Sequence, residues 1–145
     1  MGIKNNNPGN IRVSTVKWKG EIPSLTPFEA FSTLMHGYRA LISNAYHIII
    51  TDKKNTLLAF ATTWAPPSEN NTANYAKILA KYTGLGINDK IKWTNQFIFD
   101  LCVGVSMAEN STYNATAIME AIKDLQAGGK IASKTEAVDQ KKKYM

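Results

Sequence analysis

The sequence predicts a mainly α domain with a minor β part, made of about five helices and a small β-loop. Two patterns carry this prediction. From residue 28 onward, apolar side chains recur every three or four positions, which is the spacing of one face of a helix. Residues 1–27 are instead rich in Asn, Gly and Pro and hold short β-prone pieces such as residues 11–13, so we expect a shaped loop with one or two small strands.

The first predicted helix follows this loop. Its apolar face is formed by Phe28, Phe31, Met35, Tyr38, Ile42, Ala45 and Ile49. The sequence allows two starting positions for this helix. Thr26, Pro27 and Glu29 fit a capping box with proline at the first helical position, whereas Ser32 offers a later cap that leaves residues 28–31 extended. We favour the later start.

Four further helices follow from their capping residues. Asn55 can cap a short helix that runs through Trp64 and ends before Pro66 and Pro67, and Thr72 can cap another through Tyr82 that ends at Gly84. The last two are expected to begin at Asp89, in a helix leading to Glu109, and at Asn114, before Gly128 and Gly129. We therefore expect a single domain over residues 1–129 and a charged, flexible or frayed helical tail over residues 130–145.

The charge of the chain is concentrated in that tail. The net charge of the chain is +6. Residues 130–145 hold five lysines, Glu136 and Asp139, so this segment has a net charge of +3 and carries half of the total. The remainder is only mildly basic, which suits a polyanionic cell wall. With no basic helix face or arginine stripe, we do not expect the protein to bind nucleic acid.

Several classes of function are not expected from this composition. Cys102 is the only cysteine and lies in an apolar stretch, so we predict a buried, inert thiol without a disulfide. His36 and His47 lack a third ligand at metal spacing, so we predict neither a metal site nor another cofactor. Neither a secretory leader nor an apolar run of about 18 residues is visible, so we expect no signal peptide and no membrane insertion.

The most informative candidate for chemistry is Glu109. An apolar stripe formed by Trp93, Phe97, Leu101, Val105 and Ala108 places this acid in the last turn of a half-buried helix. Apolar surroundings disfavour an ionised carboxyl and keep its proton available, as a general acid in glycoside cleavage requires. The alternative is a solvated acid at a helix end. Glu21 and Glu29 are other acids near the first loop, but neither ends an apolar helix.

Two polar and aromatic loops could accompany such an acid. Asn6 and Asn10 flank a Pro-Gly turn that can present amides to a sugar, and Trp18 is either a flat sugar platform or a core residue. The second loop contains Trp64, Glu69, Asn70 and, shortly after, Tyr75. Glu69 is a candidate second carboxylate or, equally, a charge that stabilises the start of the next helix.

Five pieces of the sequence form a pattern: Asn6-Asn7-Pro8-Gly9-Asn10-Ile11-Arg12, Trp18-Lys19-Gly20, Phe28-Glu29-Ala30-Phe31, Gly37-Tyr38-Arg39-Ala40-Leu41, and the stretch from Trp64 to Thr72 with Tyr75. Together they resemble a family of phage and prophage virion proteins that is often labelled structural protein P5 or lysozyme-like. The resemblance spans about residues 2–87.

The same pieces are more distantly similar to peptidoglycan glucosaminidases and lytic transglycosylases. In those enzymes the helix that ends in the catalytic Glu precedes the Asn-Asn turn, whereas here the matching helix, residues 102–111, lies after it. The resemblance therefore implies a circularly permuted, lysozyme-like domain of two lobes.

What the resemblance implies for function is cleavage of peptidoglycan glycan strands. Glu109 would be the catalytic acid, Glu69 its partner, and Asn6, Asn10, Trp18, Trp64, Asn70 and Tyr75 would line the cleft. The alternative is a non-catalytic virion protein that binds cell-wall glycan. We expect a monomer that meets bacterial peptidoglycan and phage virion proteins, located in the virion or in the bacterial cytoplasm with delivery to the cell wall.

Overall fold

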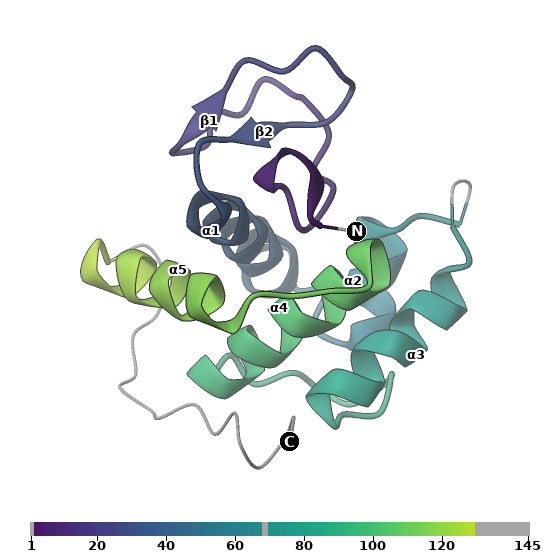
Figure 1. The fold of residues 1–145 in the computed structure, drawn as a ribbon. Coiled ribbons are helices and arrows are strands. Elements are labelled where there is room, and N and C mark those ends of the chain that lie inside the picture. The colour runs from purple at the N-terminus through teal and green to yellow at the C-terminus, as the bar shows by residue number, and fades with distance from the viewer. Residues whose placement is uncertain (1, 68–69, 130–145) are drawn as a thin grey trace.

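The computed structural model describes residues 2–67 and 70–129, and in them five α-helices accompany one two-stranded sheet (Figure 1). This confirms the mainly α fold with a minor β part. The helices are α1 (Leu34–Tyr46), α2 (Leu57–Trp64), α3 (Thr72–Thr83), α4 (Asn95–Asn110) and α5 (Ala115–Ala127), and the strands are β1 (Glu21–Ile22) and β2 (Ala30–Phe31). A short 3₁₀ turn spans Lys4–Asn6, and a π-helical turn, His47–Thr51, continues α1. Glu69 and the predicted tail lie outside the described residues.

Each of these helices begins at a side chain that accepts a hydrogen bond from the backbone N–H three residues later. The capping residues are Thr33, Thr56, Asn71, Thr94 and Asn114. The cap at Asn114 is confirmed, and the later start of α1 is confirmed to within one residue of Ser32. Asn55 and Thr72 are each one residue from the true cap. Such neighbours compete because Asn and Thr both accept this bond readily.

The predicted start of α4 at Asp89 is wrong. The Asp89 carboxylate accepts a hydrogen bond from the backbone N–H of Gly86 at 2.7 Å and so closes a local turn. The helix begins five residues later, where the Thr94 hydroxyl accepts from the N–H of Phe97 at 3.1 Å. An aspartate serves a turn as well as it serves a helix, so its identity alone does not decide between them.

Helix α4 is the centre of the helical core. It lies between α3 and α5 and also contacts α1 (Figure 1). Every residue from Phe97 to Ser106 is buried, so the expectation of a half-buried helix is wrong. A helix that is surrounded by other helices needs apolar side chains on all its faces. Cys102 is fully buried here, as expected, and burial raises the pKa of its thiol.

The residues before α1 form a separate N-terminal lobe (residues 2–33), which sits above α1 in Figure 1. Its strands pair antiparallel, with Glu21 opposite Phe31, and Arg12 bridges to Phe28 in a second antiparallel pair. A small cluster of Ile11, Phe31 and Ala40, with Trp18 and Trp64 packed against it, joins this lobe to the helices.

The backbone of the lobe lies close against α1 at Gly37. A Cβ atom there would lie 1.8 Å from the carbonyl oxygen of Asn6, so only glycine permits the contact. In the described part of the chain, none of the helices has the length and apolar character needed to cross a membrane.

Candidate functional site

The amide-rich turn is organised by Asn7, which is buried. Its Nδ2 donates to the carbonyl oxygens of Ile11 at 2.9 Å and Glu29 at 3.0 Å, and its Oδ1 accepts from the N–H of Ile11 at 3.0 Å. Asn6 donates to the carbonyl oxygen of Phe31 at 3.0 Å. Both amides thus bind the protein's own main chain, because an extended loop with few regular hydrogen bonds needs side chains to satisfy its carbonyl groups. Asn6 is absent from the groove lining described below, contrary to its predicted place in the cleft.

The C-terminal end of α4 lies against this turn (Figure 1). Asn110 donates from Nδ2 to the carbonyl oxygen of Pro8 at 2.9 Å, and the helix then stops at Ser111, which has a left-handed backbone (φ 58°). Asn10 also has a left-handed backbone (φ 49°), which asparagine tolerates better than most residues. Two segments about a hundred positions apart in the chain therefore meet at one corner.

Both oxygens of the Glu109 carboxyl accept hydrogen bonds at this corner. Oε1 accepts from Nδ2 of Asn10 at 2.8 Å, and Oε2 accepts from the hydroxyl of Tyr75 at 2.8 Å. Burial, and then the nearby Glu109, raise the pKa of Tyr75, so its phenol keeps its proton and acts as the donor. The nearby Trp64 side chain acts on the pKa of Tyr75 in the opposite direction, and its effect is the smaller one.

Glu109 opens into a groove of about 960 Å³ between the N-terminal lobe and the helices. The lining residues come from the amide-rich turn and the strand segment after it, from the end of α1, and from the end of α2 and the loop that follows. They are Gly9, Asn10, Ile11, Arg12, Ser14, Val16, Trp18, Phe28, Ser43, Asn44, His47, Ile48, Asp52, Thr63, Trp64, Pro66, Asn70 and Glu109. A cavity of this size matches sites that take small molecules or segments of a polymer.

The structure brings most of the sequence-predicted residues to this groove. Asn10, Trp18, Trp64 and Asn70 line it together with Glu109. Tyr75 is buried behind the carboxyl and is not in the lining, so its contact is with Glu109.

Trp64 is held by Phe60. The two rings stack with centroids 5.3 Å apart, which fixes the Trp64 indole in the groove wall. Trp18 also packs against the small cluster that joins the lobes, so it contributes to packing and lines the groove, while its role as a sugar platform stays a prediction.

Sequence reasoning missed the wall supplied by α1 and its π-helical turn. Ser43, Asn44, His47 and Asp52 line the groove there, and Nε2 of His47 lies 3.4 Å from Oδ2 of Asp52. The signal was available, since Ser43, Asn44 and His47 are polar residues at a spacing that puts them on one side of the helix. π-helical turns occur often at functional sites. The histidine was considered only as a metal ligand.

Within residues 2–67 and 70–129, no three His, Cys, Asp or Glu side chains converge in a way that could hold a metal ion. Asp52 and Glu109 are the carboxylates among the described lining residues. The other predicted acid, Glu69, lies outside the part of the chain that the structure describes.

Comparison with known proteins finds a phage relative. The chain is 35% identical over 95 residues to Protein P5 of Pseudoalteromonas phage PM2. The match covers 62% of the chain and 59% of that protein, so the chain spans about three fifths of the relative's length. No protein-family model matches the chain. The predicted resemblance to a phage protein is thus confirmed at the level of sequence similarity.

Proposed function

We propose that the protein cleaves the glycan strands of bacterial peptidoglycan, with Glu109 as general acid. The observation that carries this proposal is the position of the Glu109 carboxyl. It is held by Asn10 and Tyr75, and it opens into a groove that also contains two tryptophans. A catalytic acid must be fixed beside a binding site, and these contacts fix it.

The groove has the chemistry that a glycan requires. Trp18 and Trp64 offer flat apolar surfaces on which sugar rings can stack, and Asn10, Asn70 and Asn44 offer amide donors and acceptors for hydroxyl and acetamido groups. In the reaction the Glu109 proton passes to the glycosidic oxygen while the bond from that oxygen to the anomeric carbon breaks. The oxygen of a water molecule then forms a bond to the anomeric carbon, and Glu109 takes one proton from that water. Alternatively, a hydroxyl of the same sugar adds to that carbon and returns its proton, as in a lytic transglycosylase.

The meeting of Glu109 and Asn10 also supports the proposed lysozyme-like fold with permuted order. The Glu109 carboxyl accepts a hydrogen bond from Asn10 in the amide-rich turn, although the two residues are 99 positions apart in the chain. If the catalytic helix had moved from one end of the chain to the other, the contact between helix and turn would survive in this form, because a permutation changes connections and leaves the packing in place.

A second candidate function is a virion protein that binds wall glycan without cutting it. The similarity to a protein of phage PM2 favours a role in a phage. In addition, both Glu109 oxygens already accept hydrogen bonds from the protein, so the carboxyl also ties the end of α4 to the N-terminal lobe and to α3. A fold can keep such a tie after its chemistry is lost.

Replacing Glu109 by glutamine separates the two functions. Glutamine keeps the size of the side chain but cannot supply the proton, so clearing of purified peptidoglycan in a zymogram is expected to fall by at least 100-fold. Tyr75→Phe removes one of the two hydrogen bonds to the carboxyl and leaves the acid in place, and we expect a loss of clearing of about ten-fold.

Binding to insoluble peptidoglycan is the control for both variants. If the protein is an enzyme with Glu109 as general acid, Glu109→Gln must still bind peptidoglycan but no longer clear it. Equal clearing by the wild type and Glu109→Gln would exclude Glu109 as the acid, and binding without any clearing by the wild type would establish the second function.

A further inference from the structure

We propose that Arg12 selects glycan strands that carry a carboxylate over neutral strands, an inference that rests on the proposed glycan-cleaving function. Arg12 lines the groove that Glu109 opens into. Its guanidinium carbon lies 5.0 Å from the centroid of the Phe28 ring, which lines the same groove. Arginine stacked on an aromatic ring is a common way to present a cation to a planar acidic group.

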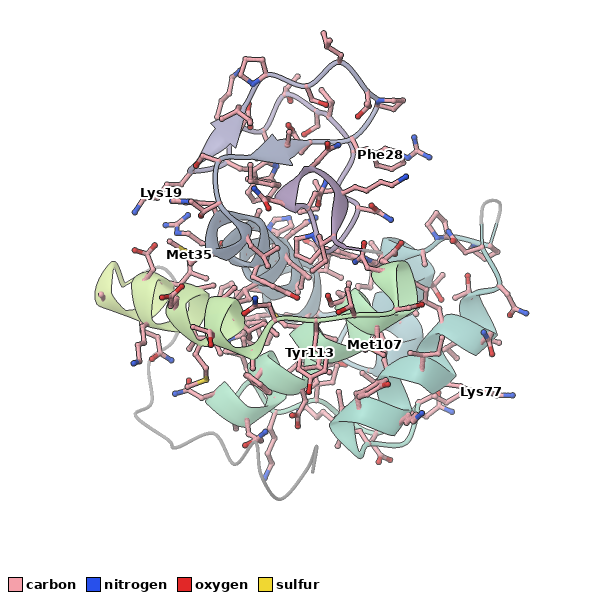
Figure 2. The ribbon with its side chains drawn as sticks, in the orientation of Figure 1. Lys19, Phe28, Met35, Lys77, Met107 and Tyr113 are labelled. Carbon is pink, nitrogen blue, oxygen red and sulfur yellow. The ribbon has the colours of Figure 1, made fainter. Side chains whose placement is uncertain are left out.

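The position of Arg12 is set by the backbone around it. Arg12 pairs with Phe28 in an antiparallel bridge, and this pair is flanked by two hydrogen bonds, from the N–H of Glu29 to Ile11 at 2.8 Å and from the N–H of Val13 to Pro27 at 2.9 Å. Paired residues of antiparallel strands carry their side chains on the same face, so the ring lies beside the cation. Phe28 extends from the segment just before β2, on the opposite side of the lobe from Lys19, which lies above α5 (Figure 2).

Arg12 also lies close to the reacting centre. Asn10, Ile11 and Arg12 are consecutive in the chain, and all three line the groove. The cation therefore lies on the same wall as Asn10, whose amide donates a hydrogen bond to Glu109.

The charges of the groove make this cation matter. The acidic side chains among the described lining residues are Glu109 and Asp52, and an ionised carboxyl in the groove repels an anionic ligand. The basic side chains among them are Arg12 and His47, and Nε2 of His47 lies 3.4 Å from Oδ2 of Asp52. The planar guanidinium of Arg12 matches the geometry of a carboxylate, so an acidic group on the strand is stabilised beside it.

Peptidoglycan carries acidic groups of this kind. Every second sugar bears a lactyl ether that ends in a carboxyl, which is free when the stem peptides have been removed and is amide-linked when they are present. With stems in place, the carboxylates belong to the peptides instead. Chitohexaose has the same type of sugar backbone without either group, and it is the neutral comparison.

The test measures binding in a Glu109→Gln background, which needs no cleavage. The probes are peptide-free peptidoglycan strands, strands with stem peptides, and chitohexaose. We expect Arg12→Gln to weaken binding of at least one acidic strand roughly ten-fold and to leave chitohexaose within two-fold. Arg12→Lys keeps the charge without the planar stack and should recover part of the loss. Weakening with peptide-free strands assigns the lactyl carboxylate, and weakening only with stem-bearing strands assigns the peptide carboxylates.

Lys81→Gln in the same background is the matched control. The Lys81 ammonium also lies over an aromatic ring, that of Tyr82 at 5.4 Å, but on α3 and outside the groove lining. Lys81→Gln removes one positive charge, as Arg12→Gln does, and should leave the affinity for each of the three probes unchanged. If Arg12→Gln binds all three probes as the parent does, or loses affinity equally for all three, the selection by Arg12 is overturned. Absence of clearing by the wild type would instead overturn the proposed activity, which this binding measurement does not use.

Discussion

The helical core and the N-terminal lobe are held in their folds by different interactions. In the centre of α4 every residue from Phe97 to Ser106 is buried, and all of them except Asp100 and Ser106 lack a polar side chain, so much of the stabilisation comes from apolar packing that is spread over many contacts. In the N-terminal lobe, by contrast, a single buried amide, Asn7, makes three directed hydrogen bonds to the main chain. The comparison teaches that the lobe, which positions Asn10 against Glu109, depends on individual atoms more than the core does.

The same substitution, placed once where α1 meets the N-terminal lobe and once inside the helical core, tests this difference most strongly. In Gly37→Ala the new Cβ would lie 1.8 Å from the backbone oxygen of Asn6, which cannot rotate away. In Gly104→Ala it would meet Cδ2 of Leu79 at 3.0 Å, a side-chain atom that can shift. We expect Gly37→Ala to lower the free energy of unfolding by about 3 kcal/mol or more, and Gly104→Ala to change it by no more than about 1 kcal/mol.

Denaturant unfolding followed by tryptophan fluorescence measures both changes. Since Trp18 and Trp64 pack at the junction of the lobes, their signal also shows whether the N-terminal lobe separates from α1. A larger loss for Gly104→Ala than for Gly37→Ala would refute the contrast between the two regions.

Removing the Asn7 amide is expected to have the next largest effect. Asn7→Ala removes the partner of the Glu29 carbonyl and of the Ile11 N–H and one of the two bonds to the Ile11 carbonyl, and we expect a loss of about 2–4 kcal/mol in the free energy of unfolding. Asn6→Ala removes one such bond and should cost about 1 kcal/mol. Amide hydrogen exchange at Ile11, whose N–H donates to Asn7, locates the change, and unaltered protection of that amide in Asn7→Ala would contradict the role given to the side chain.

The two regions also differ in how far the sequence predicted them. Local signals were sufficient for the helices, since the Asn114 cap is confirmed and the other short helices begin within one residue of the expected cap. They failed where a residue type serves two purposes, as for Asp89, which closes a turn. They also did not reveal that α4 is buried on all sides, because periodicity shows which face is apolar and not how many neighbours a helix has.

The candidate site was only partly predictable for a related reason. The composition of the first loop indicated exposed amides, but not which of them turn inward, and Asn7 and Asn6 bind the main chain while Asn10 faces the groove. The contact between Asn10 and Glu109 joins residues 99 positions apart, which no local pattern specifies. It was expected only through the resemblance to proteins with a permuted order of the same pieces.

Two carboxylates, one in each region, are expected to make the free energy of unfolding change with pH in opposite directions. Glu29, in the N-terminal lobe, is buried, and its Oε2 has no hydrogen-bond partner among the described residues. Burial, and then the charge of Glu21, raise the pKa of Glu29 above its ordinary value of 4.5. The folded protein therefore holds this proton more tightly than the unfolded chain does, and the ionised form lowers stability above the raised pKa.

We expect Glu29→Gln to increase the free energy of unfolding by about 1 kcal/mol at pH 7, and the gain should vanish below about pH 4. A gain that persists in acid would show a cause other than the charge.

Asp124, in the helical core's outer layer, should show the reverse and smaller effect. Its Oδ2 lies 2.7 Å from Nε of Arg39 and 3.5 Å from Nζ of Lys19, so it links α5 to α1 and to the N-terminal lobe. The Arg39 hydrogen bond lowers the pKa of Asp124 below its ordinary value of 3.8, which outweighs the opposing effect of burial. The resulting stability is present above that value and is lost as the pH falls through the lowered pKa. Because the carboxyl is partly exposed, Asp124→Asn should cost only about 0.5 kcal/mol at pH 7, and thermal unfolding of the two proteins should converge in acid. Divergence of the two curves as the pH falls would contradict a stabilising charge at this position and would place the link between the lobes in apolar packing instead.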